Sequence, residues 1–268
     1  MLGSLYDWMG APFAGLPLLS VVIIFATNFL AFLARGAIGI GAVAATVSVT
    51  AWLMPAQDAV ILTLLGATLP QIPLMREGVR DSDWHVSRPI LVGLAISIVA
   101  GVWGFTRLST DAFVLVLGIC MSLIVIFDLT GLVERLVPLM NLRSIWVAFG
   151  LALAAGLLAG LSGAGGLILI SVYLRHACRN HIALRGTMIM LGSMILIWRT
   201  IVVAFTGLIT LPLLTEALLL QPAVYGGVWV GQRFFKGLSP QAFTWLFQIV
   251  LLISALGLLV DGVAKLVR

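Results

Sequence analysis

The sequence predicts an all-α polytopic membrane protein, built as two homologous four-segment halves that form inverted repeats. Three observations support this prediction. Of the 268 residues, 62% are hydrophobic and 9% are charged, whereas a soluble domain has about 25% charged residues. Long stretches, among them residues 16–34 and 144–174, carry no charge at all. Short glycine-containing motifs also recur at a nearly constant spacing in the two halves.

The same composition excludes several classes of protein. A helix needs about 20 apolar residues to cross a bilayer, and a transmembrane β-barrel would alternate apolar and polar residues instead. No hydrophilic block is long enough to form a domain that binds nucleotide or nucleic acid. The net charge of +5 therefore reflects basic loops that set orientation. We expect a multi-pass protein of the cell inner (plasma) membrane, with no nucleic-acid partner and no cofactor.

Two motifs indicate an internal duplication. The first is G-x-x-G-x-G within an apolar run, and it occurs twice. A shift of 124 positions superposes Gly36, Gly39 and Gly41 on Gly160, Gly163 and Gly165. Further along, Gly101-Val102-Trp103 matches Gly227-Val228-Trp229 at a shift of 126. The small, one-directional drift is what loop insertions would produce. We therefore divide the chain into a lead-in at 1–15, a first repeat at 16–134 and a second repeat at 144–268.

Each repeat reads as a long glycine-containing apolar stretch followed by three spanning helices. The predicted segments are 16–54, 57–75, 89–106 and 111–133 in the first repeat, and 145–174, 186–208, 211–231 and 242–264 in the second. The first segment of each repeat is too long for one untilted crossing, and glycine weakens a helix. Both stretches are therefore predicted to form glycine-broken helical hairpins.

Basic loops support the hairpins. Ten of the fifteen Lys and Arg residues lie in the loops 76–88, 134–143, 175–185 and 232–237. All four loops share the cytoplasmic side only if 144–174 enters and leaves the membrane by the same face, turning at 160–166. Arms of about 11–16 residues would reach roughly 16–24 Å into the membrane. A plain eight-crossing topology, the alternative, would divide the basic residues almost evenly and violate the positive-inside tendency.

The motifs resemble those of the sulfite-exporter-like (TauE/SafE) permeases. The turn GLSGAGGLILIS at 160–171, its counterpart GAIGIGAVAATVSV at 36–49, and the ending that starts at Gly231 carry the resemblance. It spans about residues 20–265. It implies transport of sulfite, sulfonates, sulfoacetate or related sulfur anions, coupled to an ion gradient.

Glycine turns at mid-membrane are candidate anion sites because they leave backbone N–H groups and helix N-termini free. Discontinuous helices at the interface of two repeats are the usual place for a transporter site. The candidate residues are Gly39, Gly41, Gly163, Gly165 and Gly166. The alternative is that glycines at these positions serve close helix packing.

Arg199 is the leading charged candidate. It lies 13 and 16 residues from the two ends of the stretch 186–215, which holds no other charge. That is too far to reach the membrane surface easily, and a charge there marks a functional site by default. Its guanidinium suits a sulfite or sulfonate oxyanion. A structural ion pair is the alternative. Arg35 precedes Gly36 and either faces the site or marks the end of a full crossing.

Three further polar residues complete the candidate set. Ser162 lies within the glycine turn and could donate to an anion. Gln71 lies between Pro70 and Pro73, where a distorted helix frees carbonyl groups. Asp128 is the candidate for proton coupling, although it also fits an interfacial acid that caps a helix.

The sequence thus predicts a secondary transporter of a small anion, and no enzyme. A passive anion channel and, less favoured, an intramembrane enzyme remain as alternatives. A metal site at His176, Cys178 and His181 is disfavoured because arginines flank these residues and the spacing is not that of a zinc site.

Overall fold

The structure is a computed structural model that describes residues 12–38, 42–131, 135, 144–234, 252, 253, 255–260 and 262–264. The described helices are α2 (Leu18–Ile38), α3 (Ala42–Thr50), α4 (Ala56–Thr68), α5 (Gln71–Asp81), α6 (Trp84–Arg107), α7 (Thr110–Thr130), α9 (Ile145–Ser162), α10 (Gly166–Ala177), α11 (His181–Ala204) and α12 (Leu211–Phe234). The described residues form no strand, and the prediction of an all-helical protein is confirmed.

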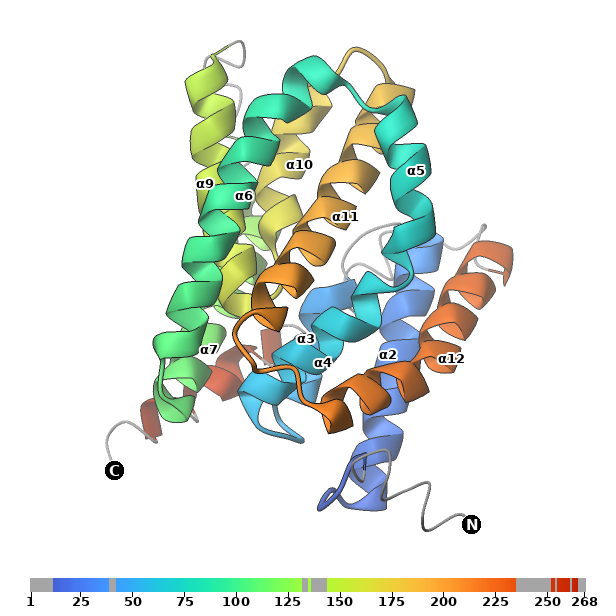
Figure 1. Ribbon diagram of the computed structural model, residues 1–268, viewed down its shortest axis with the longest axis vertical. Coiled ribbons are helices and arrows are strands. Elements are labelled where there is room, and N and C mark those ends of the chain that lie inside the picture. The colour runs from blue at the N-terminus through green and yellow to red at the C-terminus, as the bar shows by residue number, and fades with distance from the viewer. Residues whose placement is uncertain are drawn as a thin grey trace.

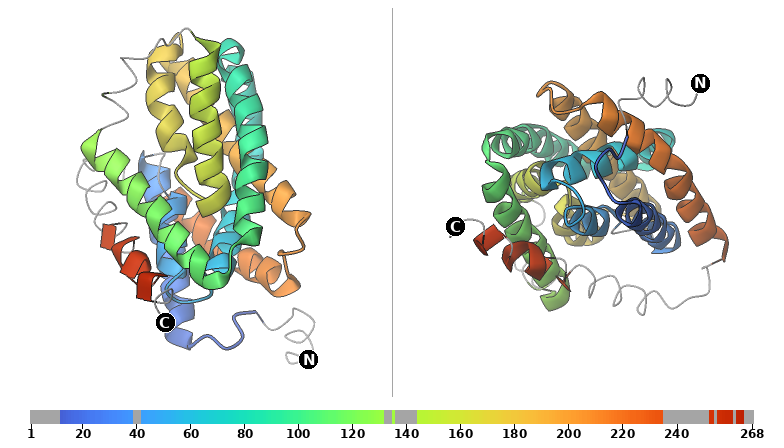
Figure 2. Two further views of the ribbon diagram at one scale, coloured as in Figure 1. Left: turned by 90° about the vertical axis from the view of Figure 1, so that its left-hand side faces the viewer. Right: turned by 90° about the horizontal axis from the view of Figure 1, so that it is seen from below.

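Among the described helices, six are long and apolar enough to cross a membrane, namely α2, α6, α7, α9, α11 and α12, and the bent pair α4–α5 could form a seventh span. The helices stand roughly side by side, with α6 against α9 on one flank and α2 against α12 on the other. Between the flanks, α11 packs against α5 (Figure 1). The view from below in Figure 2 shows the same helices gathered into one bundle.

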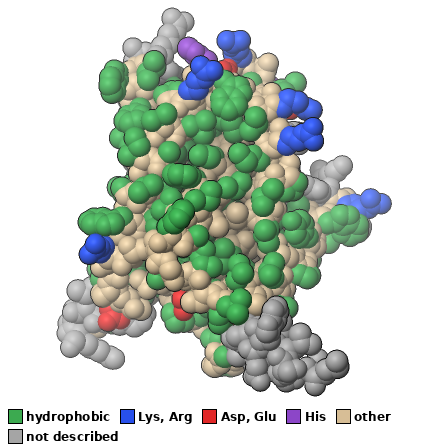
Figure 3. All heavy atoms as spheres, in the orientation of Figure 1, with side chains coloured by type: hydrophobic (Ala, Val, Ile, Leu, Met, Phe, Trp, Pro, Cys, Tyr) green, Lys and Arg blue, Asp and Glu red, His purple; other side chains and the backbone are tan. Residues whose placement is uncertain are grey.

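Exposed apolar side chains cover the middle of the bundle (Figure 3), while most of the Lys and Arg side chains in that view lie toward its upper end. The loops 76–88 and 175–185 meet at this end. Arg179 Nε lies 3.7 Å from Asp83 Oδ2, and the backbone N–H of Asp83 donates to Thr187 Oγ1 at 2.9 Å. Two of the four basic loops that the sequence assigns to one face therefore lie together.

Two predicted helices begin earlier than their sequence boundaries because polar residues cap them. The segment predicted at 89–106 begins at Trp84, where the Asp83 carboxylate accepts from His85 N. The segment predicted at 186–208 begins at His181, after Asn180 Oδ1 accepts from Ala183 N at 2.8 Å. Asp and Asn are favoured at the helix N-cap because their oxygens satisfy amides with no helical acceptor.

The prediction of one continuous helix at 57–75 is wrong. It is divided into α4 and α5, which meet at an angle of 55°. Pro70 has no N–H to donate to the carbonyl of Gly66, and its ring clashes with that carbonyl in a straight helix. The amide of Gln221, from α12, donates to Gly66 O at 3.3 Å instead. The break therefore leaves a carbonyl that another helix satisfies.

The predicted hairpin at 16–54 corresponds to α2 and α3, and residues 39–41 between them lie outside the described residues. Most of the predicted segment 242–264 also lies outside them; residues 255–260 are helical.

Glycines bring the paired helices close together on both flanks. A Cβ added to Gly101 of α6 would lie 2.8 Å from both Gly160 Cα and Leu157 O of α9. A Cβ added to Gly227 of α12 would clash with Phe29 O and lie 3.0 Å from Leu33 N of α2. Small residues allow such close approach between membrane helices. Gly101 and Gly227 therefore serve close helix packing.

Candidate functional site

The turn between α9 and α10 has a shape that requires glycine. Gly163 and Gly165 have φ angles of 84° and 82°, in the left-handed region that costs other residues about 1–2 kcal/mol. Ser162 lies at the end of α9, where its hydroxyl donates to Leu158 O at 2.8 Å and accepts from Ala164 N at 3.3 Å. The Ser162 hydroxyl therefore holds the turn together from inside.

Arg199, on α11, lies directly against this turn. A Cβ added to Gly163 would lie 2.6 Å from Arg199 Nη1 and 3.4 Å from Arg199 Cζ. The Arg199 side chain is 1% exposed, and its Cζ lies 5.9 Å from the centre of the Phe105 ring. Two sequence candidates that are 36 positions apart in the chain are thus brought together.

The helix boundaries place Arg199 differently from the sequence estimate. It lies five residues before the end of α11 at Ala204, and residues 205–210 connect α11 to α12. The uncharged stretch 186–215 therefore spans a helix end and a connection, and Arg199 is not at its helical midpoint. Burial by neighbouring helices, and not distance from the helix end, isolates its charge.

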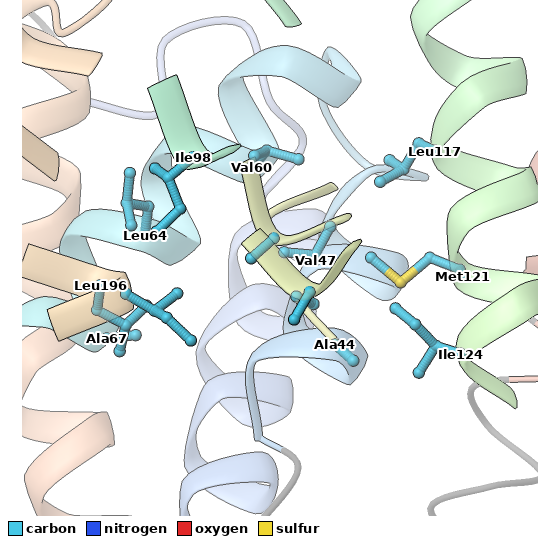
Figure 4. Close-up of a cluster of buried hydrophobic side chains, with 14 of the residues drawn as sticks. Ala44, Val47, Val60, Leu64, Ala67, Ile98, Leu117, Met121, Ile124 and Leu196 are labelled. Atoms are coloured by element: carbon cyan, nitrogen blue, oxygen red, sulfur yellow. The ribbon is translucent and has the colours of Figure 1, made fainter. Parts of the chain in front are cut away.

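Apolar side chains surround the site. Figure 4 shows Val60 of α4, Ile98 of α6, Ile124 of α7 and Leu196 of α11 converging with residues of α3. A Cβ at Gly163 would lie 3.2 Å from Val60, and one at Gly165 would clash with Ile124. The glycine turn is thus held between α4 and α7, within a surrounding that offers a cation little solvation.

Within the described part of the chain, the Arg199 guanidinium has no hydrogen-bond partner on Nε, Nη1 or Nη2. A buried charge is normally paired, because an isolated one costs several kcal/mol or more. The aromatic face of Phe105 compensates for only a part of this, about 0.5–2 kcal/mol. The described residues therefore supply no counter-ion to this guanidinium.

The start of α10 adds backbone donors to the same turn. No side chain caps α10 at Gly165 among the described residues. The first amides of a helix have no acceptor within it, and they carry the positive end of the helix dipole. Both features favour an anion beside Gly163.

Arg35 and Gln71 form a second polar group. With its carbonyl oxygen toward α2, the Gln71 amide accepts from Arg35 Nη1 at 3.1 Å and also contacts Nη2. Ser193 Oγ lies 3.4 Å from the other polar atom of the amide. Ser193 and Arg199 are six residues apart on α11, or ~9 Å along its axis. The Arg35–Gln71 group thus lies about two helical turns from Arg199.

Two of the other candidates, Gly165 and Gly166, pack against side chains and backbone other than Arg199. Gly165 packs toward Ile124, and a Cβ on Gly166 would lie 2.8 Å from Ala155 O of α9. Gly39 and Gly41 lie outside the described residues, as does the side chain of Asp128.

Several buried hydroxyls near α3 and α4 are absent from the sequence candidates. Ser48, Thr50 and Thr63 have hydroxyl oxygens without a partner in the described residues, and Thr63 lies one turn after Val60 on α4. The hydroxyl residues in the otherwise apolar stretch 42–50 were a signal in the sequence. Phe105 gave no signal, because its position over Arg199 depends on tertiary packing.

Comparison with known proteins gives one match. A family model described as "Sulfite exporter TauE/SafE" matches residues 24–258, a range that includes both glycine motifs and Arg199. Neither the curated proteins nor the solved structures gave a match.

Proposed function

Because the chain belongs to the sulfite exporter TauE/SafE family, and is therefore a multi-pass membrane transporter, we propose that its substrate is a small sulfur oxyanion or organosulfonate, such as sulfite or sulfoacetate, and that the substrate binds at Arg199. The observation that carries the proposal is the Arg199 guanidinium, which is buried, faces the bare Cα of Gly163 and has no partner in the described residues. The transporter is proposed to act in the inner (plasma) membrane.

The chemistry of the guanidinium fits this class of anion. Its planar, permanently charged fork matches two oxygens of a sulfite or sulfonate group, as it matches a carboxylate or phosphate. Amides at the start of α10 would bind a further oxygen. A low-dielectric surrounding strengthens each of these interactions. Arg35 with Gln71 supplies a second positive position along the proposed path.

We further propose that residues 16–134 and 144–268 are inverted repeats, each opening with a glycine-broken hairpin. Reciprocal packing supports this: α6 of the first repeat packs on α9 of the second, and α12 of the second packs on α2 of the first. The shift of 126 relates Gly101 to Gly227, and the shift of 124 relates Leu33 to Leu157. Gly227 meets Leu33 and Gly101 meets Leu157, so corresponding residues make corresponding contacts. Alternating access then comes from rocking of one repeat against the other.

Binding to the purified full-length protein tests the substrate class. Sulfite, thiosulfate, sulfoacetate, a short alkyl sulfonate and a carboxylate of similar size are titrated by calorimetry in detergent. Sulfur oxyanions or sulfonates are expected to bind more tightly than the carboxylate, because Arg199 and the α10 amides offer donors to three oxygens. Absence of binding by every sulfur anion would contradict the proposed function.

Cysteine labelling from the two sides of the membrane tests the hairpin. In a background without Cys120 and Cys178, cysteines replacing Arg80 and Arg179 are expected to react with an impermeant maleimide from the same side. A cysteine replacing Ser109, at the start of α7, is expected to react from the opposite side. Reaction of positions 80 and 179 from opposite sides would restore the plain eight-crossing topology.

A further inference from the structure

Glu216, in the second turn of α12, is a buried acid outside the site described above. It is 5% exposed. Its Oε1 accepts from the backbone N–H of Phe13 at 2.7 Å, while Oε2 is buried without a partner in the described residues. The carboxyl group therefore has one donor, supplied by the segment that precedes α2.

No cation lies near this carboxyl group among the described elements that pack against it. Helix α12 packs on α2 and α4. The charged residue of α4 is Asp58, whose carboxylate acts electrostatically on Glu216. The charged residue of α2 is Arg35, in its last turn, and Arg233 lies 17 residues further along α12, or ~25 Å away along the helix. The residues 12–17 contribute no charge.

The segment that covers Glu216 is held in an unusual backbone conformation. Phe13 has a φ of 56°, which is rare for a bulky residue and persists only where surrounding contacts stabilise it. Two contacts do so: the hydrogen bond to Glu216 and the packing of the Phe13 ring on the Phe25 ring, with centroids 5.9 Å apart. The Pro12–Gly15 turn is thus docked on α12 partly through the carboxylate.

In these surroundings the ionised and the protonated forms of the Glu216 carboxyl group have opposite effects on the docked turn. Its ionised form strengthens the bond from the Phe13 N–H, since bonds to a charged acceptor are about twice as strong as neutral ones. Yet that form is buried with one donor and an acidic neighbour, and a buried charge that is not fully paired is costly. A proton on Oε2 removes this cost and weakens the bond that holds the turn.

We propose that Glu216 is the site at which this transporter takes up and releases a coupling proton, and that the Pro12–Gly15 turn docks on Glu216 in the ionised state and detaches when Oε2 is protonated. The proposal rests on the proposed function, because a coupling proton requires a transported solute. It assigns to Glu216 the role that the sequence suggested for Asp128.

Helix α4 connects the proton site with the anion site. Helix α12, which carries Glu216, packs on α4, and Val60 of α4 contacts the Gly163 turn. Gln221, five residues after Glu216, donates to Gly66 O at the break between α4 and α5. A movement of α12 on loss of the docked turn is thereby transmitted to the wall of the Arg199 site.

Reactivity of a cysteine in the turn tests the proposal without any substrate. Pro12 is buried in the docked turn, and its replacement by Cys, in a background without Cys120 and Cys178, gives one position that becomes reactive when the turn detaches. Labelling by an impermeant reagent, corrected for reagent chemistry with free cysteine, is expected to accelerate as the pH is lowered. In the same protein with Glu216→Gln, labelling is expected to be fast at every pH. Labelling that is independent of pH in the protein that retains Glu216 would overturn the proposal.

Transport supplies the second readout. The accumulation of labelled sulfoacetate, driven by a pH gradient, is measured with the full-length protein in liposomes. Sulfoacetate stays ionised over the pH range of the assay. Glu216→Gln is expected to lose accumulation, and Glu216→Asp is expected to retain it. The matched control is Asp111→Asn, which removes an exposed acid at the start of α7 and is expected to retain accumulation. Accumulation by Glu216→Gln at the wild-type level would overturn the proposal. If that variant does not fold, the pH dependence of labelling at position 12 decides.

The two proposals fail in different ways. Absence of anion binding to the wild-type protein contradicts the function proposed for Arg199. Absence of pH dependence in the labelling of position 12, in a protein that binds and carries sulfoacetate, contradicts only the role of Glu216.

Discussion

Replacement of Arg199 by Gln is expected to weaken sulfite binding by at least 100-fold, or about 2.7 kcal/mol, without destabilising the fold. Gln retains a donor but loses the charge and the fork, and hydrogen bonds to a charged group contribute about 1.5–3 kcal/mol each. The guanidinium has no partner in the described residues, so its removal orphans no carboxylate among them. Calorimetry measures the affinity, and thermal unfolding in detergent measures the stability.

Stability separates a ligand-binding Arg199 from a structural one. Breaking a buried ion pair costs about 3–5 kcal/mol, whereas removing an unpaired buried charge is expected to leave Tm unchanged or to raise it. Arg107 provides the matched control: it lies on α6, with its Cζ 5.4 Å from the Trp103 ring, and is exposed. Arg107→Gln is expected to preserve sulfite binding. Unchanged affinity in Arg199→Gln, or a large fall in its Tm, would contradict the proposed site.

Replacement of Gly163 by Ala is expected to abolish sulfite binding and also to destabilise the protein. The positive φ of 84° imposes about 1–2 kcal/mol of strain on Ala. In addition, the new Cβ would lie 2.6 Å from Arg199 Nη1, which forces the guanidinium away from the turn. Calorimetry and thermal unfolding measure the two effects separately.

Gly207 is the matched control for this substitution. It has a φ of 73°, and a Cβ added there would meet nothing within 4 Å. Gly207→Ala therefore carries a similar backbone strain without displacing Arg199. It is expected to lower Tm and to preserve sulfite affinity. Equal losses of affinity in the two variants would show that strain alone explains the effect of Gly163→Ala.

The membrane class and the main residues of the candidate site could be identified in the sequence because their signals are local. A charge within an uncharged stretch, such as Arg199, is visible in the letters alone. The spacing of Gly163 and Gly165 indicates a turn because few other residues adopt a positive φ. The sequence could not predict the contact between Arg199 and Gly163, since that contact depends on how α9 and α11 pack.

Other features depended on tertiary structure. The Pro70 break was underestimated, because a proline within a helix kinks or ends it according to whether another group satisfies the freed carbonyl, here Gln221. The distance of Arg199 from the end of its helix is shorter than the sequence predicts, because the apolar stretch continues beyond the end of α11 at Ala204. The bond between Phe13 and Glu216 joins residues 203 positions apart, and no local pattern indicates it.

The most direct measurement is a structure of the protein determined with selenite, whose selenium replaces the sulfur of sulfite and gives an anomalous signal. The account predicts a selenium peak beside Gly163, with selenite oxygens within hydrogen-bond distance of the Arg199 guanidinium and the first amides of α10. A peak elsewhere in the bundle, or an Arg199 paired with a carboxylate of the chain, would contradict it.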